Sequence, residues 1–334
     1  MPYYKKHETM KQIINTSILL LILLGCKPKV DKPKYDIIIT DIPANMKELN
    51  SEYDDYNSNL TFPAQRTHLF FSSNRNSKGD NFDIVENPLD FSYHSEDDVL
   101  NLSTPNDFSG DASKILPVIN TDKNEYGPYS FHSGNNLIFM YATNSTTDNK
   151  YDIKYVELTN WNGTEGKQVV SLPNSIKALS NYKDDLYPTL TQDNTTLYFC
   201  SNQNDTVFNI YKADYKSIID ISKLTNDNDV VISKDTILSS SYNDKCPFIN
   251  QNLMVFTSNR KGGYGGYDLW YSYYKNNGWS EPINFGNKIN TEYDEYRPIT
   301  FQILNYNLMI FSSNRLGGKG GFDLYIVKIT DMIK

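Results

Sequence analysis

Acidic side chains recur at one position of a ten-residue pattern that this sequence contains five times. The two most similar copies are residues 119–128 (INTDKNEYGP) and 289–298 (INTEYDEYRP), and the others begin at residues 49, 179 and 238. The seventh position of the pattern is always acidic, and its residues are Asp55, Glu125, Asp185, Asp244 and Glu295. Grouped carboxylates bind cations, pair with basic side chains, or act as acid and base in glycoside hydrolysis.

Further charged residues recur after each copy of the ten-residue pattern. Three copies are followed by a segment that ends in Ser-Asn-Arg, which supplies Arg75, Arg260 and Arg315. A short loop later, an aromatic residue is followed by an acid in four copies, which supplies Asp83, Asp152, Asp268 and Asp323. The two sets vary together only loosely. Gln203 and Asn209 replace both charges in one repeat, whereas Ser145 replaces only the arginine in another.

Two interpretations of these charged positions remain open from the sequence. In the first, the arginine and the acids form an ion pair or a hydrogen-bonded clip within each repeat and fix its hairpin. In the second, a ring of carboxylates at a channel mouth binds a cation or a cationic ligand. Recurrence in every repeat favours the structural interpretation, because an active site seldom needs five copies of one residue.

The repeats also predict the fold that carries these residues. Each repeat consists of short β-rich runs separated by turns rich in Gly, Asn and Pro, and no amphipathic helix of useful length interrupts them. We expect an all-β, five-bladed β-propeller of four-stranded antiparallel blades over residues 37–334. In each blade, strand A follows the ten-residue pattern and strand B ends at Ser-Asn-Arg. Strand C begins at the aromatic–acid pair, and strand D precedes the next pattern.

The chain contains a candidate segment for closing the ring. The last repeat ends soon after its strand C, whereas residues 38–49 match residues 169–179, which are expected to form strand D of the second blade. We therefore expect Ile38–Thr40 and the residues after them to pair with the C-terminal strands and complete the last blade. Closure of this kind removes the exposed edge that a gap would leave.

Residues 1–26 have the pattern of a signal peptide, with basic residues before a short apolar run that ends in Leu-Leu-Gly-Cys. This junction resembles the lipobox of bacterial lipoproteins, in which the cysteine, here Cys26, becomes the lipidated first residue. The alternative is an ordinary secretory cleavage site. Residues 27–36 are expected to form a tether. Together these segments predict a protein held at the outer membrane by its lipid alone, on the periplasmic side or at the cell surface.

The sequence argues against several other functions. A net charge of −8 disfavours nucleic acid as a partner. No Gly-x-Ser-x-Gly occurs, and His and Cys are not clustered at zinc-binding spacing, so we predict no serine hydrolase, metal or other cofactor. The glycine runs 262–266 and 317–321 lack the Lys-Ser/Thr and helix of a phosphate loop and fit turns between strands. Trp161, Trp270 and Trp279 are expected to pack in or beside outer strands.

Residues 311–325 (FSSNRLGGKGGFDLY) resemble the WD40-like PD40 repeat, and residues 279–298, which begin Trp-Ser-Glu-Pro, resemble the segment that links such repeats. The resemblance covers about residues 38–330 and is most specific in the last two blades. It implies a propeller similar to that of TolB and related envelope proteins of Gram-negative bacteria. We therefore expect a non-catalytic envelope lipoprotein, not an enzyme, that binds envelope proteins or a glycan. The alternative is a carboxylate-dependent glycan hydrolase on a propeller scaffold.

Overall fold

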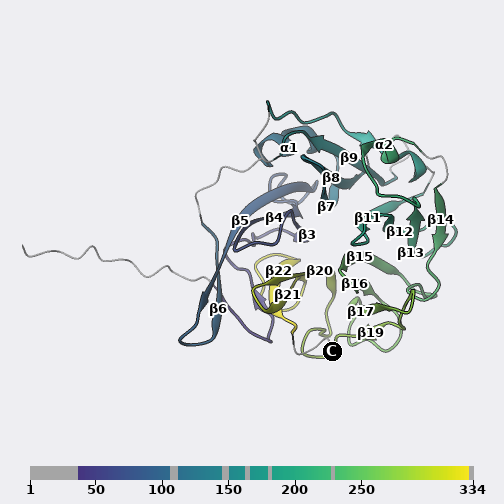
Figure 1. Cartoon of the computed structure of the whole chain (residues 1–334). Coiled ribbons are helices and arrows are strands. Elements are labelled where there is room, and N and C mark those ends of the chain that lie inside the picture. Colours follow the sequence, from purple (N-terminus) through teal and green to yellow (C-terminus); the bar gives the residue numbers. More distant parts are fainter. Residues whose placement is uncertain are drawn as a thin grey trace, which may run out of the picture. The chain divides into compact units, whose positions relative to one another are not determined.

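Five antiparallel sheets follow one another along the chain and surround a central axis (Figure 1). The computed structural model describes residues 37–105, 112–144, 150–161, 166–179, 183–226 and 230–330, so the predicted signal peptide, Cys26 and the tether lie outside the described residues. The innermost strands contact one another in ring order, and the innermost strand of the last sheet contacts that of the first. The expected five-bladed, all-β propeller is therefore confirmed.

The first three blades follow the predicted order of strands. Blade 1 contains β3 (Asp55–Leu60), β4 (Arg66–Ser73), β5 (Asp83–His94) and β6 (Val99–Ser103), with β1 (Ile37–Ile39) added beside β6. Blade 2 contains β7 (Glu125–Ser133), β8 (Asn136–Thr143), β9 (Asp152–Leu158) and β10 (Asn174–Ser175). Blade 3 contains β11 (Asp185–Leu190), β12 (Thr196–Ser201), β13 (Asn209–Asp214) and β14 (Val231–Lys234).

The last two blades differ in how their outer strands are supplied. Blade 4 contains β15 (Asp244–Asn250), β16 (Leu253–Ser258) and β17 (Asp268–Lys275), with the short strands β18 (Gly278–Trp279) and β19 (Ile283–Asn284) both pairing with β17. Blade 5 contains β20 (Glu295–Ile303), β21 (Tyr306–Ser313), β22 (Asp323–Lys328) and β2 (Ala44–Asn45). The short helices α1 (Ala112–Ile119) and η1 (Lys177–Leu179) connect successive blades, whereas α2 (Ile221–Leu224) lies between β13 and β14 within blade 3.

The middle of strand B is apolar in every blade because both of its faces are covered by neighbouring blades. In β16, all six residues of Leu-Met-Val-Phe-Thr-Ser are buried, and β8 reads Asn-Leu-Ile-Phe-Met-Tyr-Ala-Thr with only its first residue partly exposed. The long interval after the first ten-residue pattern contains the extended β5–β6 hairpin and α1 rather than a further blade. The sequence pattern did not predict α1, since it spans only two turns and contains Pro117.

The N-terminal segment closes the ring, as expected, but with a different set of residues. Ala44 and Asn45 pair with Ile326 and Tyr325, and the backbone N–H of Lys328 donates to the carbonyl of Thr40 at 2.7 Å. The prediction that Ile38 itself pairs with the C-terminal strands is wrong, because β1 pairs with β6 of blade 1. The segment thus joins the outer edges of the first and last blades.

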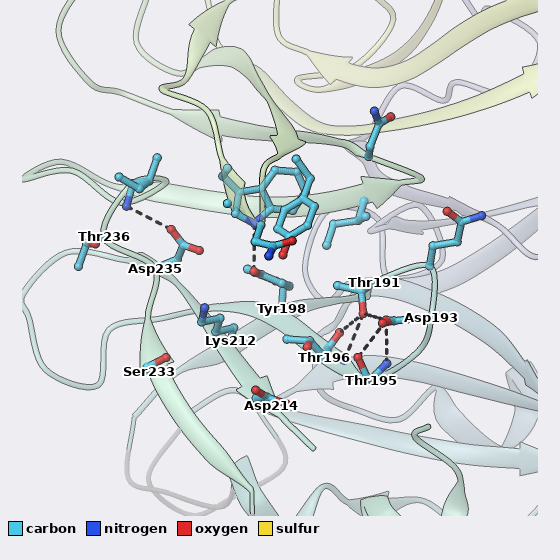
Figure 2. A pocket seen from close by; sticks show the side chains of 18 of the residues that line it. Thr191, Asp193, Thr195, Thr196, Tyr198, Lys212, Asp214, Ser233, Asp235 and Thr236 are labelled. Atoms are coloured by element: carbon cyan, nitrogen blue, oxygen red, sulfur yellow. Dashed lines mark hydrogen bonds between the residues drawn. The ribbon is translucent and has the colours of Figure 1, made fainter. Parts of the chain in front are cut away.

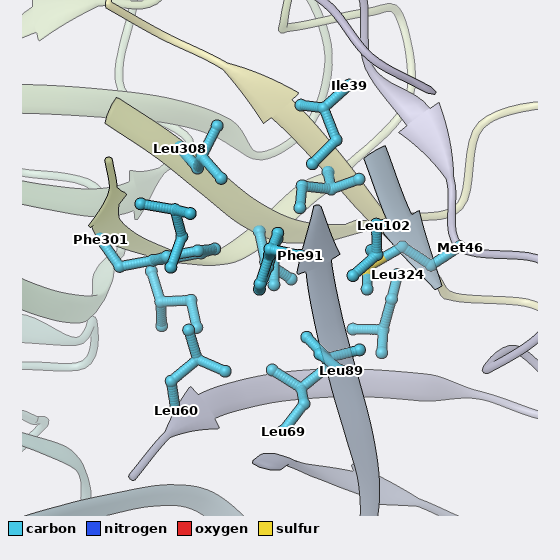
Figure 3. Close-up of a cluster of buried hydrophobic side chains, with 14 of the residues drawn as sticks. Ile39, Met46, Leu60, Leu69, Leu89, Phe91, Leu102, Phe301, Leu308 and Leu324 are labelled. Carbon is cyan, nitrogen blue, oxygen red and sulfur yellow. The ribbon is translucent and has the colours of Figure 1, made fainter. Parts of the chain in front are cut away.

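A continuous apolar cluster explains this change of partner (Figure 3). The long β5–β6 hairpin of blade 1 places Phe91 and Leu102 beside Ile39, and the same cluster includes Phe301 and Leu324 of blade 5. Pairing β1 with β6 buries Ile39 in this cluster to 6% exposure. Burial of the apolar side chain stabilises the pairing by about 1.5–3 kcal/mol.

Strand A of every blade contains a bulge at the same place. The ladder between strands A and B shifts register after the eighth residue of the pattern in all five blades. The ninth residue then has a positive φ and is buried; the five residues, with φ from 45° to 60°, are Asn57, Gly127, Tyr187, Cys246 and Arg297. Non-glycine residues adopt this conformation rarely, so its recurrence marks a feature of the fold.

Among the described residues, no helix is both long and apolar enough to cross a bilayer.

Candidate functional site at the channel mouth

Each arginine of Ser-Asn-Arg binds the acid of its own blade. The pairs, with N–O distances of 2.6, 2.6 and 2.9 Å respectively, are Arg75–Asp55, Arg260–Asp244 and Arg315–Glu295. The same guanidinium also donates to the carbonyl of the first residue of the pattern, as Arg315 does to Ile289 at 2.7 Å. All three acids are 0% exposed. These carboxylates therefore clip strand A to strand B and are not open to a cation at the channel mouth.

The acids that begin strand C bind the turn that precedes them rather than the arginine. Asp268 accepts the backbone N–H of Tyr264 at 2.6 Å and of Gly265 at 3.1 Å. Asp323 accepts the equivalent two N–H groups in blade 5, and Asp83 accepts an amide N–H of Asn76 at 2.8 Å. Each of these acids thus fastens the turn between strands B and C.

The same contact explains the glycine runs. A Cβ atom at Gly263 or Gly318 would collide with the carboxylate of Asp268 or Asp323. The runs form tight turns between strands, and no helix follows them. Asp152, the remaining member of the strand-C set, is half-buried at the start of β9.

Two acids of the ten-residue pattern lie in blades 2 and 3, where another residue replaces the arginine at the end of strand B. Asp185 and Glu125 are both 0% exposed, at the starts of β11 and β7. Glu125 accepts the hydroxyl of Thr121 at 2.7 Å and that of Thr143 at 3.3 Å. Burial of the carboxyl raises the pKa of Glu125 to about 7. Ser145, which occupies the arginine position of this blade, lies outside the described residues.

The sixth position of the ten-residue pattern, which the sequence analysis did not identify as important, connects neighbouring blades. Its side chain accepts the backbone N–H of the aromatic residue at strand C of the preceding blade, at 2.7–3.1 Å in all five blades. The five residues are Asp54, Asn124, Asp184, Asn243 and Asp294. The signal was present in the sequence, because the sixth position of the pattern is Asp or Asn in every copy.

Two of these five residues line a pocket of about 420 Å³ at the channel mouth. Asp54 comes from blade 1 and Asp294 from blade 5, which are neighbours in the ring. The other lining residues are aromatic and come from four blades: Tyr56, Phe82, Tyr187, Tyr267, Tyr296 and Phe322. The pocket lies on the face that carries the D–A connections and the B–C turns, because successive strands alternate in direction.

The aromatic rings around the pocket pack against one another. Tyr56 contacts Phe82 with ring centroids 5.0 Å apart and Phe322 at 5.8 Å, and Tyr267 contacts Tyr296 at 5.4 Å. Burial raises the pKa of Tyr56 and of Tyr296 well above the usual tyrosine value, so both keep their hydroxyl protons at neutral pH. The pocket wall therefore presents aromatic rings, and its buried tyrosines are uncharged.

The two carboxylates are held in place by the backbone. Oδ1 of Asp54 accepts the N–H of Phe322 at 2.7 Å, and Oδ1 of Asp294 accepts the N–H of Tyr267 at 2.7 Å. Oδ2 of Asp294 also accepts a weak hydrogen bond of 3.4 Å from the amide of Asn314. Among the described residues, the carboxylate of Asp54 accepts a hydrogen bond at Oδ1, from the backbone N–H of Phe322. The site thus offers two fixed carboxylates beside aromatic surfaces.

The part of the chain that the structure describes contains no cluster of three or more His, Cys, Asp or Glu residues that could hold a metal ion. Its two cysteines, Cys200 and Cys246, are buried free thiols in one cluster near the channel.

No family model matches this chain, and no curated protein matches it. Its fold is similar to that of an endo-arabinase from Bacteroides thetaiotaomicron, at 13% identity and a TM-score of 0.50, over 84% of this chain and 98% of that one. It is similar to the β-xylosidase RS223, at 7% identity and a TM-score of 0.52, over 86% of this chain and 94% of that one. A structure described as a glycoside hydrolase matches at 7% identity and a TM-score of 0.52, over 88% and 91% of the two chains.

These comparisons correct one expectation from the sequence. The expected non-catalytic binding module is overturned as the leading interpretation, because the similar propellers reported above are described as an endo-arabinase, a β-xylosidase and a glycoside hydrolase. At such low sequence identity, the similarity to these structures supports the five-bladed fold alone. Of the two functions expected from the sequence, the glycan hydrolase is the one that we propose below.

Proposed function

We propose that this propeller is a glycoside hydrolase that cleaves a glycan at the channel-mouth pocket. The observation that carries the proposal is the position of Asp54 and Asp294, two carboxylates from neighbouring blades that line one aromatic pocket. Glycoside hydrolysis needs two such groups. One carboxylic acid protonates the leaving glycosidic oxygen, while the other carboxylate either activates the attacking water or attacks the sugar carbon itself.

The remainder of the pocket suits a sugar. The apolar faces of sugar rings pack on aromatic side chains such as those that line this pocket. A volume of about 420 Å³ lies within the usual range of ligand pockets. Propellers of similar fold are described as an endo-arabinase and a β-xylosidase, so arabinose- and xylose-based glycans are the first substrates to test.

The decisive experiment uses the natural variation among the blades. Asn124 and Asn243 already occupy the position of Asp54 and Asp294 and accept the same backbone hydrogen bond. Asp54→Asn and Asp294→Asn therefore remove a charge while keeping the inter-blade contact. We expect each variant to fold normally and to lose hydrolysis by about 10²- to 10⁴-fold, as removal of a general acid or base does.

Asp184→Asn is the matched control for this experiment. Asp184 accepts the backbone N–H of Tyr151 in the same way but does not line the pocket, so its variant should keep full activity. Reducing sugar released from arabinan, xylan and a wider glycan panel is the measurement. Equal activity in all three variants would exclude Asp54 and Asp294 as the catalytic pair, and absence of hydrolysis across the panel would reject the function.

We also propose that the protein works in the cell envelope, anchored by a lipid on Cys26 and spaced from the membrane by residues 27–36. The signal-peptide pattern and the Leu-Leu-Gly-Cys junction support this location. Metabolic labelling with a palmitate analogue should mark the wild-type protein in the membrane fraction, and Cys26→Ala should abolish the label. Labelling that persists in the variant would contradict the assignment.

We also propose that the repeats are of the PD40 type. Support comes from the roles that the repeated residues take in the fold: in blades 4 and 5 the arginine clips strand B to strand A, and the acid after the aromatic residue fastens the glycine turn. A motif that stabilises each blade in this way can be shared by propellers of different activity.

A further inference from the structure

A second and larger hollow lies between blades 3 and 4 (Figure 2). This groove, of about 810 Å³, is lined by residues from 191–198, 212–214, 233–237, 249–252 and 274–279. It includes the A–B hairpins of both blades and the C–D hairpin of blade 4, which lie on the face opposite the channel-mouth pocket, together with residues 235–237 of the connection between the two blades. None of the residues that line it lines that pocket.

An aromatic pair forms one side of the groove. Tyr274 and Trp279 are directly opposite each other in the β17–β18 ladder, with ring centroids 5.2 Å apart. Asn276 and Asn277, at the tip of this hairpin, both have positive φ (52° and 64°), as a tight two-residue turn requires. The indole N–H of Trp279 donates to the hydroxyl of Tyr198 at 3.0 Å, which fixes the orientation of the indole ring.

The aromatic pair is accessible, unlike the other tryptophan of blade 4. Tyr274 is 45% exposed and Trp279 is half-buried, whereas Trp270 is 7% exposed. The expectation that the tryptophans pack in or beside outer strands therefore describes Trp270, while Trp279 also faces the groove. An exposed aromatic surface beside polar groups is the usual composition of a ligand site.

The opposite side of the groove is polar and rigid. The A–B hairpin of blade 3 is tied by Asp193, whose Oδ1 accepts the hydroxyl of Thr191 at 2.6 Å and both the N–H and the hydroxyl of Thr195. These bonds hold the pKa of Asp193 below its usual value, so the carboxylate is ionised at neutral pH. The amides of Gln251 and Asn252 lie along the same groove.

The charges of the groove argue against an anionic ligand. Three carboxylates, from Asp193, Asp214 and Asp235, line it with only two lysines. One of these lysines, Lys234, is paired with Asp205 at 3.0 Å. A phosphate-rich or sulfated polymer would meet net repulsion, whereas an uncharged glycan would find hydrogen-bond acceptors, amides and ring faces together.

We propose that the blade 3–4 groove is a second, non-catalytic glycan site that holds an uncharged oligosaccharide on the face opposite the channel-mouth pocket. The inference takes from the proposed function only the class of ligand. Binding energy here would come mainly from sugar rings stacked on Tyr274 and Trp279, with Asp193 and the amides orienting the hydroxyl groups.

Calorimetric titration tests the proposal without interference from cleavage. The full chain carrying both Asp54→Asn and Asp294→Asn is titrated with linear hexasaccharides of arabinose, xylose, glucose and mannose. We expect at least one to bind, and addition of Tyr274→Ala to weaken that binding by 10-fold or more. Trp279→Phe keeps an aromatic ring but loses the bond to Tyr198, so it should weaken binding less.

Tyr264→Ala is the matched control, because Tyr264 is also a half-exposed tyrosine of blade 4 but lies in the B–C turn on the other face. Its variant should bind as the parent does. Binding unaffected by Tyr274→Ala, or no binding to any of the four hexasaccharides, would overturn the proposal. The two proposals fail separately: groove binding without any hydrolysis by the wild-type protein rejects only the proposed function.

Discussion

The guanidinium of Arg297 reaches across the propeller to the carbonyl oxygen of Pro128, at 3.2 Å. Arg297 belongs to blade 5 and Pro128 to blade 2, and a second N–H of the same side chain donates to Pro247 of blade 4 at 3.2 Å. The arginine is fully buried, lies at the bulge of strand A, and stacks over Tyr187, whose ring lines the channel-mouth pocket. One side chain thus ties three blades together beneath the candidate active site.

Arg297→Ala is expected to destabilise the protein by about 2–4 kcal/mol, because it leaves two buried carbonyls without a donor and opens a cavity in the channel. Urea unfolding followed by circular dichroism measures the change. Arg66→Ala is the control, since Arg66 forms an exposed pair with Asp90 at 3.2 Å and its loss should cost less than about 1 kcal/mol. Equal stability of Arg297→Ala and wild type would mean that the cost of burying the charge cancels its hydrogen bonds.

The clip between Arg315 and Glu295 should show strong coupling. Arg315→Gln leaves a buried carboxylate without its counter-charge and is expected to cost about 3–5 kcal/mol. Adding Glu295→Gln removes that stranded charge, so the double variant should be about 1–3 kcal/mol more stable than the sum of the two single changes implies. A double-mutant cycle at pH 7 provides the test, and simple additivity would show that the pair does not act as a unit.

Glu125 should make stability depend on pH. Its pKa is raised from 4.5 to about 7 in the folded protein, so the folded state holds a proton that the unfolded state has released between these two values. The contribution of Glu125 to the free energy of unfolding is therefore greatest below pH 4.5 and falls as the pH rises to about 7. The slope is about 1.4 kcal/mol per pH unit at most.

Glu125→Gln removes this titration while keeping an acceptor for Thr121. The difference in unfolding free energy between wild type and variant should change across the interval from pH 4.5 to pH 7 and remain flat above it. Chemical denaturation at several pH values measures it. A constant difference over the whole range would show that the carboxyl group titrates normally.

The repeat pattern predicted the blades because strand periodicity and turn residues recur with it. The pairing between strands A and B is also the same in all five blades. The pattern left open which of the two acids of a repeat pairs with the arginine, for a geometric reason. Ser313 at the end of β21 is paired with both Glu295 in strand A and Asp323 in strand C, so the arginine two residues later could turn to either side. The loose covariation of the arginine with the strand-C acid did not identify the partner, because that acid binds the glycine turn instead.

Other features were invisible because their residues share no chemistry. The bulge position is occupied by Asn, Gly, Tyr, Cys and Arg in the five blades, and only the backbone conformation is common to them. The blade 3–4 groove is similar in this respect: Asp193 comes from one hairpin, Tyr274 and Trp279 come from another, and none of the three stands at a position of the ten-residue pattern. The channel-mouth acids, in contrast, stand at the sixth position of the ten-residue pattern. That position is an acid at Asp54 and Asp294 but an amide in two other blades.

The pairing of Ala44 and Asn45 with β22 has a consequence for how the molecule is made. The first strand of blade 5 along the chain is matched with a strand of the same blade that comes about 280 residues later, so the circle cannot close before the last blade has formed. Long-range contacts of this kind slow folding, and until they form, β22 presents a bare strand to other chains. A partly folded chain of this protein is therefore most vulnerable to aggregation while β2 and β22 remain unpaired, when a single missing pairing separates it from a sealed structure.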